Sequence, residues 1–155
     1  RIWLMTGKRV YKAITRGIFN FTDREGGGRR LVNDAPLLRD VMLRDKDVRD
    51  VAIVAFADRR TGVGLYAFAE TNRLDIEDRL KSALSASNGP KPPEHLQLVP
   101  ALPRDAAGKV RTEILQLVAM NQVDLIPPLL NTDADRTLMG PILDARKNLR
   151  DRFSF

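Results

Sequence analysis

The longest uninterrupted apolar run of the chain covers residues 51–57 and reads VAIVAFA. It has the length of a β-strand and falls far short of the roughly 20 apolar residues that span a bilayer. A nearly continuous apolar run of this length is typical of a strand buried inside a sheet. The run therefore predicts a buried strand, and no stretch of the sequence predicts a membrane-spanning helix.

Two further strands are predicted after this run. Residues 65–69 follow a turn marked by Gly62 and Gly64, and the short link favours antiparallel pairing with the first strand. A third short strand is predicted at residues 96–99. Together with the helices below, this order predicts an α+β domain. It has a small, mainly antiparallel sheet of about three strands, flanking helices, a β-rich N-terminal segment and a C-terminal tail helix.

The predicted helices follow from capping residues and apolar spacing. Asp34 precedes Pro36 and several apolar residues, which predicts the N-cap of a short helix. Asp75 is predicted to cap a second helix, and a third is predicted over residues 111–124. The tail helix is predicted to begin near Pro141. Its apolar stripe consists of Leu138, Ile142, Ala145, Leu149 and Phe153.

The charge of the chain is concentrated at its start. The formal net charge is +6, and residues 1–30 hold eight basic and two acidic side chains, which accounts for all of the excess. A basic segment of this kind attracts phosphate groups, whether they belong to a nucleotide or to nucleic acid.

Cysteine is absent, and His95 is the single histidine. Disulfides, thiolate metal sites and multi-histidine zinc sites are therefore impossible, and no metal site is predicted. A chain without cysteine fits the cytoplasm, which is the expected compartment. His95 follows two prolines and is expected at the surface.

Residues 102–111, LPRDAAGKVR, contain the strongest candidate site residue. Lys109 follows Gly108 at the end of a predicted irregular loop, directly before a helix. Gly108 lets the backbone bend and a ligand approach closely, while Lys109 has a long stem that can reach into a site built by another domain. A positive charge beside a phosphate and a carboxylate would stabilise negative charge developing between them. On spacing alone, a surface turn with a solvated lysine is the commoner meaning.

Residues 103–109 resemble the proline-basic-x-x-x-Gly-Lys signature of the AMP-forming acyl-CoA synthetases, which belong to the adenylate-forming superfamily. Three upstream segments agree with that family in order and spacing. They read VRDVAIV at 48–54, GLYAF at 64–68 and LVPALP at 98–103. The resemblance covers about residues 31–120 and is specific as a set, although each piece alone is weak.

The resemblance implies a small C-terminal domain that rotates over its own large N-terminal domain. In that family the loop lysine reaches the substrate carboxylate and the ATP α-phosphate, so Lys109 is implied to promote acyl-adenylate formation, with Gly108 beside the nucleotide. Family members often carry an arginine three residues after the lysine. Here that position holds Thr112, and Arg111 is the nearby candidate for binding the nucleotide. ATP, Mg²⁺ and CoA are the implied cofactors of the full-length enzyme.

The basic start is similar to the hinge motif of the same family, G-R-x-D-D-x-I-K-x-x-G. Gly7 and Gly17 stand at its glycine positions, and Lys8 replaces the arginine that helps to contact ATP. Val10 and Ile14 stand where the motif has an acid and a lysine. A divergent hinge and a chance match both remain open.

The prediction from sequence is thus a chain of three parts: a basic hinge-like segment (1–30), a lid domain (31–124) and a tail with a helix (125–155). The predicted function is that of the mobile C-terminal domain of an AMP-forming acid–CoA ligase, which acts on a fatty or other carboxylic acid. The fragment alone is expected to be inactive. Its predicted partners are the N-terminal domain, the acid and CoA, with a second copy bound through the tail helix as a further candidate.

Two alternatives stay open. The chain could be a non-catalytic relative kept for assembly or regulation, as the altered hinge suggests. It could also bind nucleic acid, because Trp3, Tyr11, Phe19 and Phe21 interleave the basic residues as in stacking platforms. No RNA-recognition or helix-turn-helix signature supports the second alternative, so it is the less favoured one.

Overall fold

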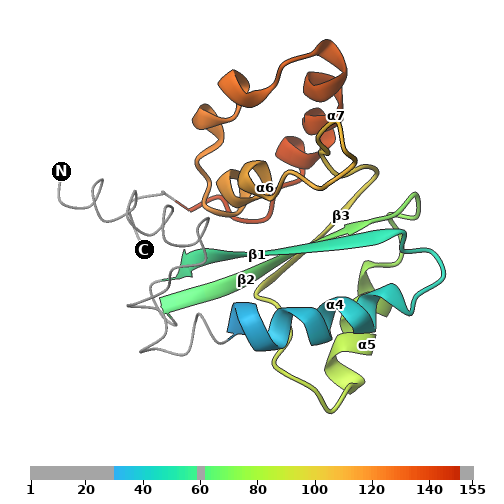
Figure 1. The fold of residues 1–155 in the computed structure, drawn as a ribbon. Helices are drawn as coiled ribbons and strands as arrows, with labels where there is room; N and C mark the ends of the chain where they lie inside the picture. The colour runs from blue at the N-terminus through green and yellow to red at the C-terminus, as the bar shows by residue number, and fades with distance from the viewer. Residues whose placement is uncertain (1–29, 59–61, 151–155) are drawn as a thin grey trace.

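A three-stranded sheet in the order β1-β2-β3 lies at the centre of the domain (Figure 1). The structure is a computed structural model, and it describes residues 30–58 and 62–150. Strands β1 (Asp50–Asp58) and β2 (Gly62–Glu70) pair antiparallel, and β3 (His95–Val99) pairs parallel to β2. The predicted α+β class and its three strands are confirmed. The β-rich segment expected at the start of the chain lies outside the described residues.

Helices cover both faces of the sheet. In Figure 1, α4 and α5 lie on one side of the strands, and α6 and α7 lie on the other. Because α5 carries the chain from the end of β2 back to the start of β3, these two strands run parallel. The helices and helical turns in the described ranges are η1 (Arg30–Asp34), α4 (Ala35–Leu43), α5 (Glu77–Ala86), α6 (Thr112–Ala119), η2 (Val123–Leu125), η3 (Pro127–Leu129) and α7 (Asp133–Asp144).

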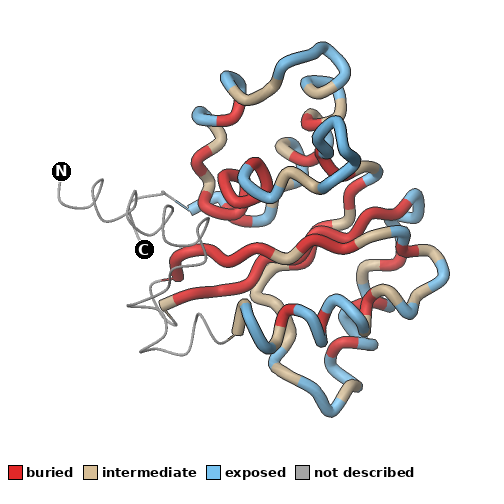
Figure 2. Tube along the Cα trace, viewed as in Figure 1, coloured by how far each residue is buried: buried red, intermediate tan, exposed pale blue. Residues whose placement is uncertain are grey.

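The apolar run at residues 51–57, from which a strand was predicted, lies in the core of the domain. Figure 2 shows that β1 and β2 are buried along most of their length. Phe56, Leu65 and Tyr66 are fully buried in the same cluster as Met139 and Ile142 of α7. The C-terminal helix therefore packs against the same core as the sheet.

Two aspartates do not cap helices in the way that the sequence predicted. Asp34 stands at the N-cap position of α4, but its side chain accepts no capping hydrogen bond and lies 3.9 Å from the Arg30 guanidinium. Asp75 is not the cap of α5, because that position is taken by Ile76. The carboxylate of Asp75 pairs instead with Arg73 at 2.8 Å, since an ionised guanidinium is a stronger donor than a backbone N–H.

Two helix boundaries also differ from the prediction. Helix α6 ends at Ala119, because the chain turns at Asn121, whose φ is 53°. Helix α7 begins at Asp133 rather than near Pro141, because the Thr132 side chain accepts the N–H of Asp135 at 3.1 Å and caps the helix there.

The predicted apolar stripe of the tail helix is wrong at its C-terminal end. Pro141 lies inside α7, and Leu149 lies beyond the end of that helix with 68% of its surface exposed. Phe153, the last member of the stripe, is outside the described residues.

His95 is half-buried rather than exposed at the surface. It opens β3, is partly buried, and lies 5.3 Å from the ring of Phe56 and 5.4 Å from that of Tyr66, measured between ring centres. Burial is the main cause that lowers the pKa of His95 below its ordinary value. In the described ranges, no helix has the length and apolar character to cross a membrane.

Candidate functional site

The predicted irregular loop around Lys109 is an ordered hairpin. We call residues 103–111 the lysine hairpin. Arg104 and Val110 form an antiparallel bridge, and the N–H of Arg111 donates to the Pro103 carbonyl at 2.8 Å. The N–H of Asp105 donates to the Lys109 carbonyl, also at 2.8 Å. Backbone hydrogen bonds therefore fix the position of the Lys109 main chain.

Asp105 and Gly108 close the turn of this hairpin. The Gly108 N–H donates to the Asp105 carbonyl at 2.9 Å, and Gly108 has a φ of +84°. That left-handed conformation is the one that a three-residue hairpin loop needs and that glycine adopts without strain. The Asp105 carboxylate accepts the N–H groups of Ala107 and Lys109 at 2.9 and 3.0 Å. The turn is thus specified by its own residues.

The Lys109 side chain projects from this rigid turn into solvent. The residue is exposed, and no acid of residues 30–58 or 62–150 forms a salt bridge with it. A lysine that is fixed at its backbone and unpaired at its ammonium can meet an anion brought by another domain.

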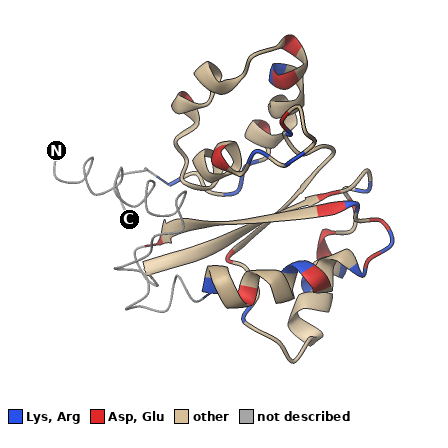
Figure 3. Ribbon diagram, in the orientation of Figure 1, with Lys and Arg blue, Asp and Glu red and all other residues tan. Residues whose placement is uncertain are grey.

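Arg104 attaches the hairpin to the sheet. Its guanidinium contacts the Asp50 carboxylate at 3.0 Å, the Glu70 carboxylate at 3.3 Å and the Gly108 carbonyl at 3.2 Å. Asp50 begins β1 and Glu70 ends β2, and the two residues are partners across the strand pair. Figure 3 shows acidic residues at this end of the two strands. We call Asp50, Glu70 and Arg104 the carboxylate clamp.

Both carboxylates of the clamp are held by other groups as well. Burial raises the pKa of Asp50, but hydrogen bonds from Val51, Arg104 and Arg39 outweigh it and hold that pKa below its ordinary value. Glu70 is buried and accepts the N–H of Leu102 at 2.7 Å. The clamp thus offers two carboxylate acceptors at fixed positions.

The other predicted site residues are placed as follows. Gly108 and Arg111 lie in the lysine hairpin with Lys109. The Arg111 side chain turns back onto the domain, where it contacts Glu113 at 3.0 Å and the Leu129 carbonyl at 2.9 Å. Lys8 lies outside the described residues. The nucleotide-binding roles predicted for Gly108, Arg111 and Lys8 stay predictions.

Sequence reasoning missed the roles of Asp50 and Glu70 in the clamp. In the sequence, Arg104 stood out only as the basic position of the proline-basic-x-x-x-Gly-Lys signature. Asp50 is 54 residues earlier in the chain than Arg104, and only the fold brings the two together. The available signal was that both acids flank predicted strands.

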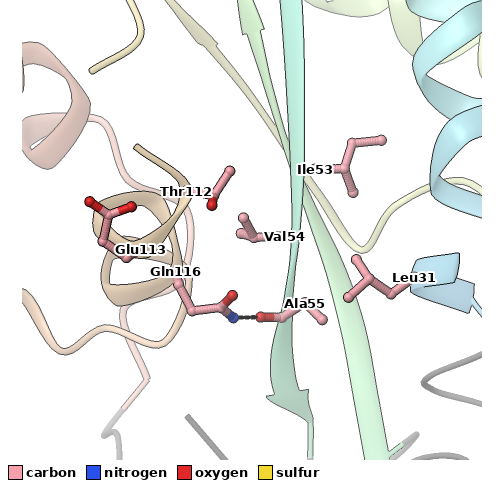
Figure 4. A pocket seen from close by; sticks show the side chains of 7 residues that line it. All are labelled: Leu31, Ile53, Val54, Ala55, Thr112, Glu113 and Gln116. Atoms are coloured by element: carbon pink, nitrogen blue, oxygen red, sulfur yellow. Dashed lines mark hydrogen bonds between the residues drawn. The ribbon is translucent and has the colours of Figure 1, made fainter. Parts of the chain in front are cut away.

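A pocket with a volume of about 290 Å³ opens at the outer edge of β1, next to the start of α6. Figure 4 shows Leu31 and Ile53 on one side of the strand and Thr112, Glu113 and Gln116 of α6 on the other. The Gln116 amide donates to the Ala55 carbonyl across this space. No group of three or more acidic or histidine side chains in the described part of the chain is arranged to hold a metal ion.

Comparison with known proteins gives the family context. No protein-family model matches the chain. Acetyl-coenzyme A synthetase 2 of Pseudomonas putida is 32% identical over 107 residues, which are 65% of this chain and 16% of that protein. The acetyl-coenzyme A synthetase of Halorhodospira halophila is 29% identical over 114 residues, 70% of this chain and 17% of that protein. ATP-bound MatB from Rhodopseudomonas palustris aligns over 58% of this chain and 18% of its own, with 18% identity and a TM-score of 0.49.

The chain therefore spans about a sixth of the length of these curated relatives. The sequence relatives match about 65% of this chain. They confirm the predicted resemblance: over that part, the chain is similar to acetyl-coenzyme A synthetases, consistent with the C-terminal domain of an adenylate-forming enzyme.

Proposed function

We propose that this chain is the mobile C-terminal domain of an AMP-forming acid–CoA ligase and that Lys109 promotes formation of the acyl-adenylate. The observation that carries the proposal is the exposed ammonium of Lys109, unpaired among the described residues, on a hairpin whose backbone is fixed. A lysine that served only as a solvated surface residue would not need a backbone held by these hydrogen bonds.

The proposed chemistry needs a cation between two anions. A carboxylate oxygen of the acid attacks the α-phosphorus of ATP, the bond to the bridging oxygen breaks, and pyrophosphate leaves. The Lys109 ammonium, placed beside the attacking carboxylate and the α-phosphate, lowers the repulsion between them and stabilises charge on the phosphate oxygens. In the second step the CoA thiol loses its proton, attacks the acyl carbon and displaces AMP.

The residues that are described fit only part of this reaction. An ammonium suits phosphate and carboxylate oxygens, so Lys109 fits the nucleotide. Mg²⁺ would neutralise phosphate charge when bound, and the described part of the chain has no group of three or more acidic or histidine side chains arranged to hold it. The acid pocket is proposed to lie in the N-terminal domain.

Several finer points stay predictions. The sequence pointed to fatty or other acyl acids, whereas the relatives are named for acetyl-coenzyme A, so a panel of short and long acids has to identify the substrate. The cytoplasmic location, the homodimer through the tail helix and the division at residues 30 and 124 are likewise untested predictions.

The test is Lys109→Ala in the full-length protein, with the two half-reactions measured separately. Acid-dependent exchange of pyrophosphate into ATP should fall by about 100-fold or more, as for the loss of one group aimed at developing charge. Thioester formation from supplied acyl-adenylate should survive. Lys46→Ala is the matched control, because Lys46 is also exposed and in a loop but lies outside the hairpin.

Two outcomes would contradict the proposal. Near-normal exchange in Lys109→Ala would show that Lys109 does not act in adenylation. Failure of the unaltered full-length protein to exchange pyrophosphate with any acid of the panel would favour the non-catalytic relative.

A further inference from the structure

We infer that Arg104 is a positioning residue for Lys109, which it serves by locking the lysine hairpin onto the end of the sheet. The inference rests on the proposed function of Lys109 and adds the part of the fold that holds its ammonium in place. Arg104 itself is not assigned a contact with substrate.

The geometry joins three parts of the chain at one guanidinium. One terminal nitrogen of Arg104 contacts both Asp50 of β1 and Glu70 of β2, at 3.0 and 3.3 Å. The other donates to the Gly108 carbonyl at 3.2 Å. That carbonyl belongs to the peptide unit that leads into Lys109, so the contact fixes the orientation of the lysine backbone relative to the sheet.

The two acceptors on the sheet are themselves rigid. Asp50 and Glu70 face each other across the β1–β2 pair, so the strand register sets their separation. The Arg39 guanidinium donates to Asp50 at 2.8 Å, and the Leu102 N–H donates to Glu70 at 2.7 Å. Arg104 therefore contacts acceptors that have fixed positions on the sheet, and through these contacts it fixes the hairpin relative to the sheet.

The contribution of Arg104 is geometric more than stabilising. Its side chain is 35% exposed, and ion pairs that solvent reaches contribute little to folding. Glu70 is buried, but without Arg104 it keeps the Leu102 N–H and the Arg49 guanidinium as partners. The hairpin also keeps its own backbone hydrogen bonds without Arg104. A planar guanidinium can reach acceptors in three directions at once, whereas the ammonium of a lysine cannot hold the same arrangement.

Loss of Arg104 should therefore free the hairpin to tilt while the fold persists. A misplacement of about 1 Å at a reacting group can cost up to about 100-fold in rate. We expect Arg104→Ala to lower the kcat of adenylation by about 10- to 100-fold, with the thioester step and the KM for ATP little changed. The kcat of adenylation of Arg104→Lys should lie between that of the unaltered protein and that of Arg104→Ala.

The experiment is a double-mutant cycle in the full-length protein. It compares the unaltered protein, Arg104→Ala, Lys109→Ala and the double variant in both half-reactions. If Arg104 acts through Lys109, the double variant should adenylate no more slowly than Lys109→Ala alone. Arg49→Ala is the matched control, because Arg49 also approaches Glu70, at 3.6 Å, but donates its hydrogen bond to the Pro100 carbonyl, outside the hairpin.

Each other result overturns the inference in a distinguishable way. Normal adenylation in Arg104→Ala, with Lys109→Ala inactive, removes the positioning role and leaves the proposed function standing. A further loss in the double variant as large as in Arg104→Ala means that Arg104 acts independently of Lys109. Loss of both half-reactions together with a lowered unfolding temperature makes Arg104 a folding residue. Normal adenylation in Lys109→Ala removes the proposed function and this inference with it.

Discussion

The hydroxyl of Tyr66 accepts a hydrogen bond from the backbone N–H of Lys147, which lies 81 residues further along the chain, at 2.8 Å. The same hydroxyl bonds the Gln97 side chain, whose amide donates to the Ile142 carbonyl at 2.9 Å. A buried chain of polar groups thus joins β2, β3 and the end of α7.

Tyr66→Phe should lower the free energy of unfolding by about 1–3 kcal/mol, because it leaves Gln97 and the Lys147 N–H without their buried partner. The ring and its packing are unchanged, so the loss reports the hydroxyl alone. Denaturant unfolding of the two proteins at neutral pH measures it. A difference under about 0.3 kcal/mol would contradict the network.

The effect of Tyr66→Phe should also depend on pH. Burial raises the pKa of Tyr66 from 10.0 to about 12, against the opposing hydrogen bond from Lys147. Because the folded chain holds this proton more tightly, the stability is complete below pH 10 and is lost as the pH rises through about 12. The stability difference between the two proteins should shrink over that range.

Gly64→Ala should destabilise the chain by about 1–3 kcal/mol through overpacking. A methyl group at Gly64 would lie 2.5 Å from the Phe56 ring, which is fully buried and faces Gly64 across the strand pair. Gly140→Ala is the matched control inside α7, where no atom outside the helix backbone and the two chain neighbours lies within 4 Å of the added carbon. Its gain in helix propensity is opposed by Pro141, which restricts the residue before it, so the thermal unfolding temperature should fall clearly in Gly64→Ala and change little in Gly140→Ala.

Gly108→Ala should destabilise the chain by about 1–2 kcal/mol, the cost of a left-handed conformation for a residue with a side chain. The cause is the φ of +84° and not crowding, because nothing lies within 4 Å of an added carbon. Gly108→Asn should cost less, since asparagine tolerates this conformation better. Equal losses for the two variants in chemical denaturation would argue against a conformational cause.

Glu94→Gln should lower the free energy of unfolding at neutral pH by about 1–3 kcal/mol, because it removes a charged acceptor. Glu94 accepts the Leu65 N–H at 2.7 Å and pairs with Arg30 at 2.7 Å. Burial raises the pKa of Glu94, but these donors outweigh it and hold that pKa below its ordinary value of 4.5.

The stability that depends on the Glu94 charge is therefore present above pH 4.5 and is lost as the pH falls through the lowered pKa of the folded chain. Unfolding measured from neutral to acid pH should show the two proteins converge at the acid end. A difference that stayed constant with pH would mean that the charge of Glu94 contributes nothing.

The sequence predicted those parts of the fold that depend on local pattern. Residues 51–57 indicated a buried strand, which the structure contains, and the glycine before Lys109 correctly marked a turn. The carboxylate clamp could not be predicted, because the contact between Asp50 and Arg104 exists only once the sheet has formed. The position of Lys109 could be predicted from sequence, but its support could not.

At the wrongly predicted helix boundaries, two local sequence signals indicate different end points. Pro141 suggested a helix start, since proline suits a first turn, yet Thr132 with Asp135 three residues later was the stronger capping signal. Asn121 tolerates a positive φ and so ended α6 early.

The Gln116 amide at the outer edge of β1 has a consequence for contacts between copies of the chain. The Arg39 guanidinium donates to the Val51 carbonyl at 2.9 Å, and Gln116 donates to that of Ala55, so two acceptors on the open edge are already occupied. An open edge strand invites pairing with a strand of another molecule, which is a route to aggregation. Among the described residues no strand pairs with this edge of β1, and a strand of another molecule would first have to displace an arginine and a glutamine from it.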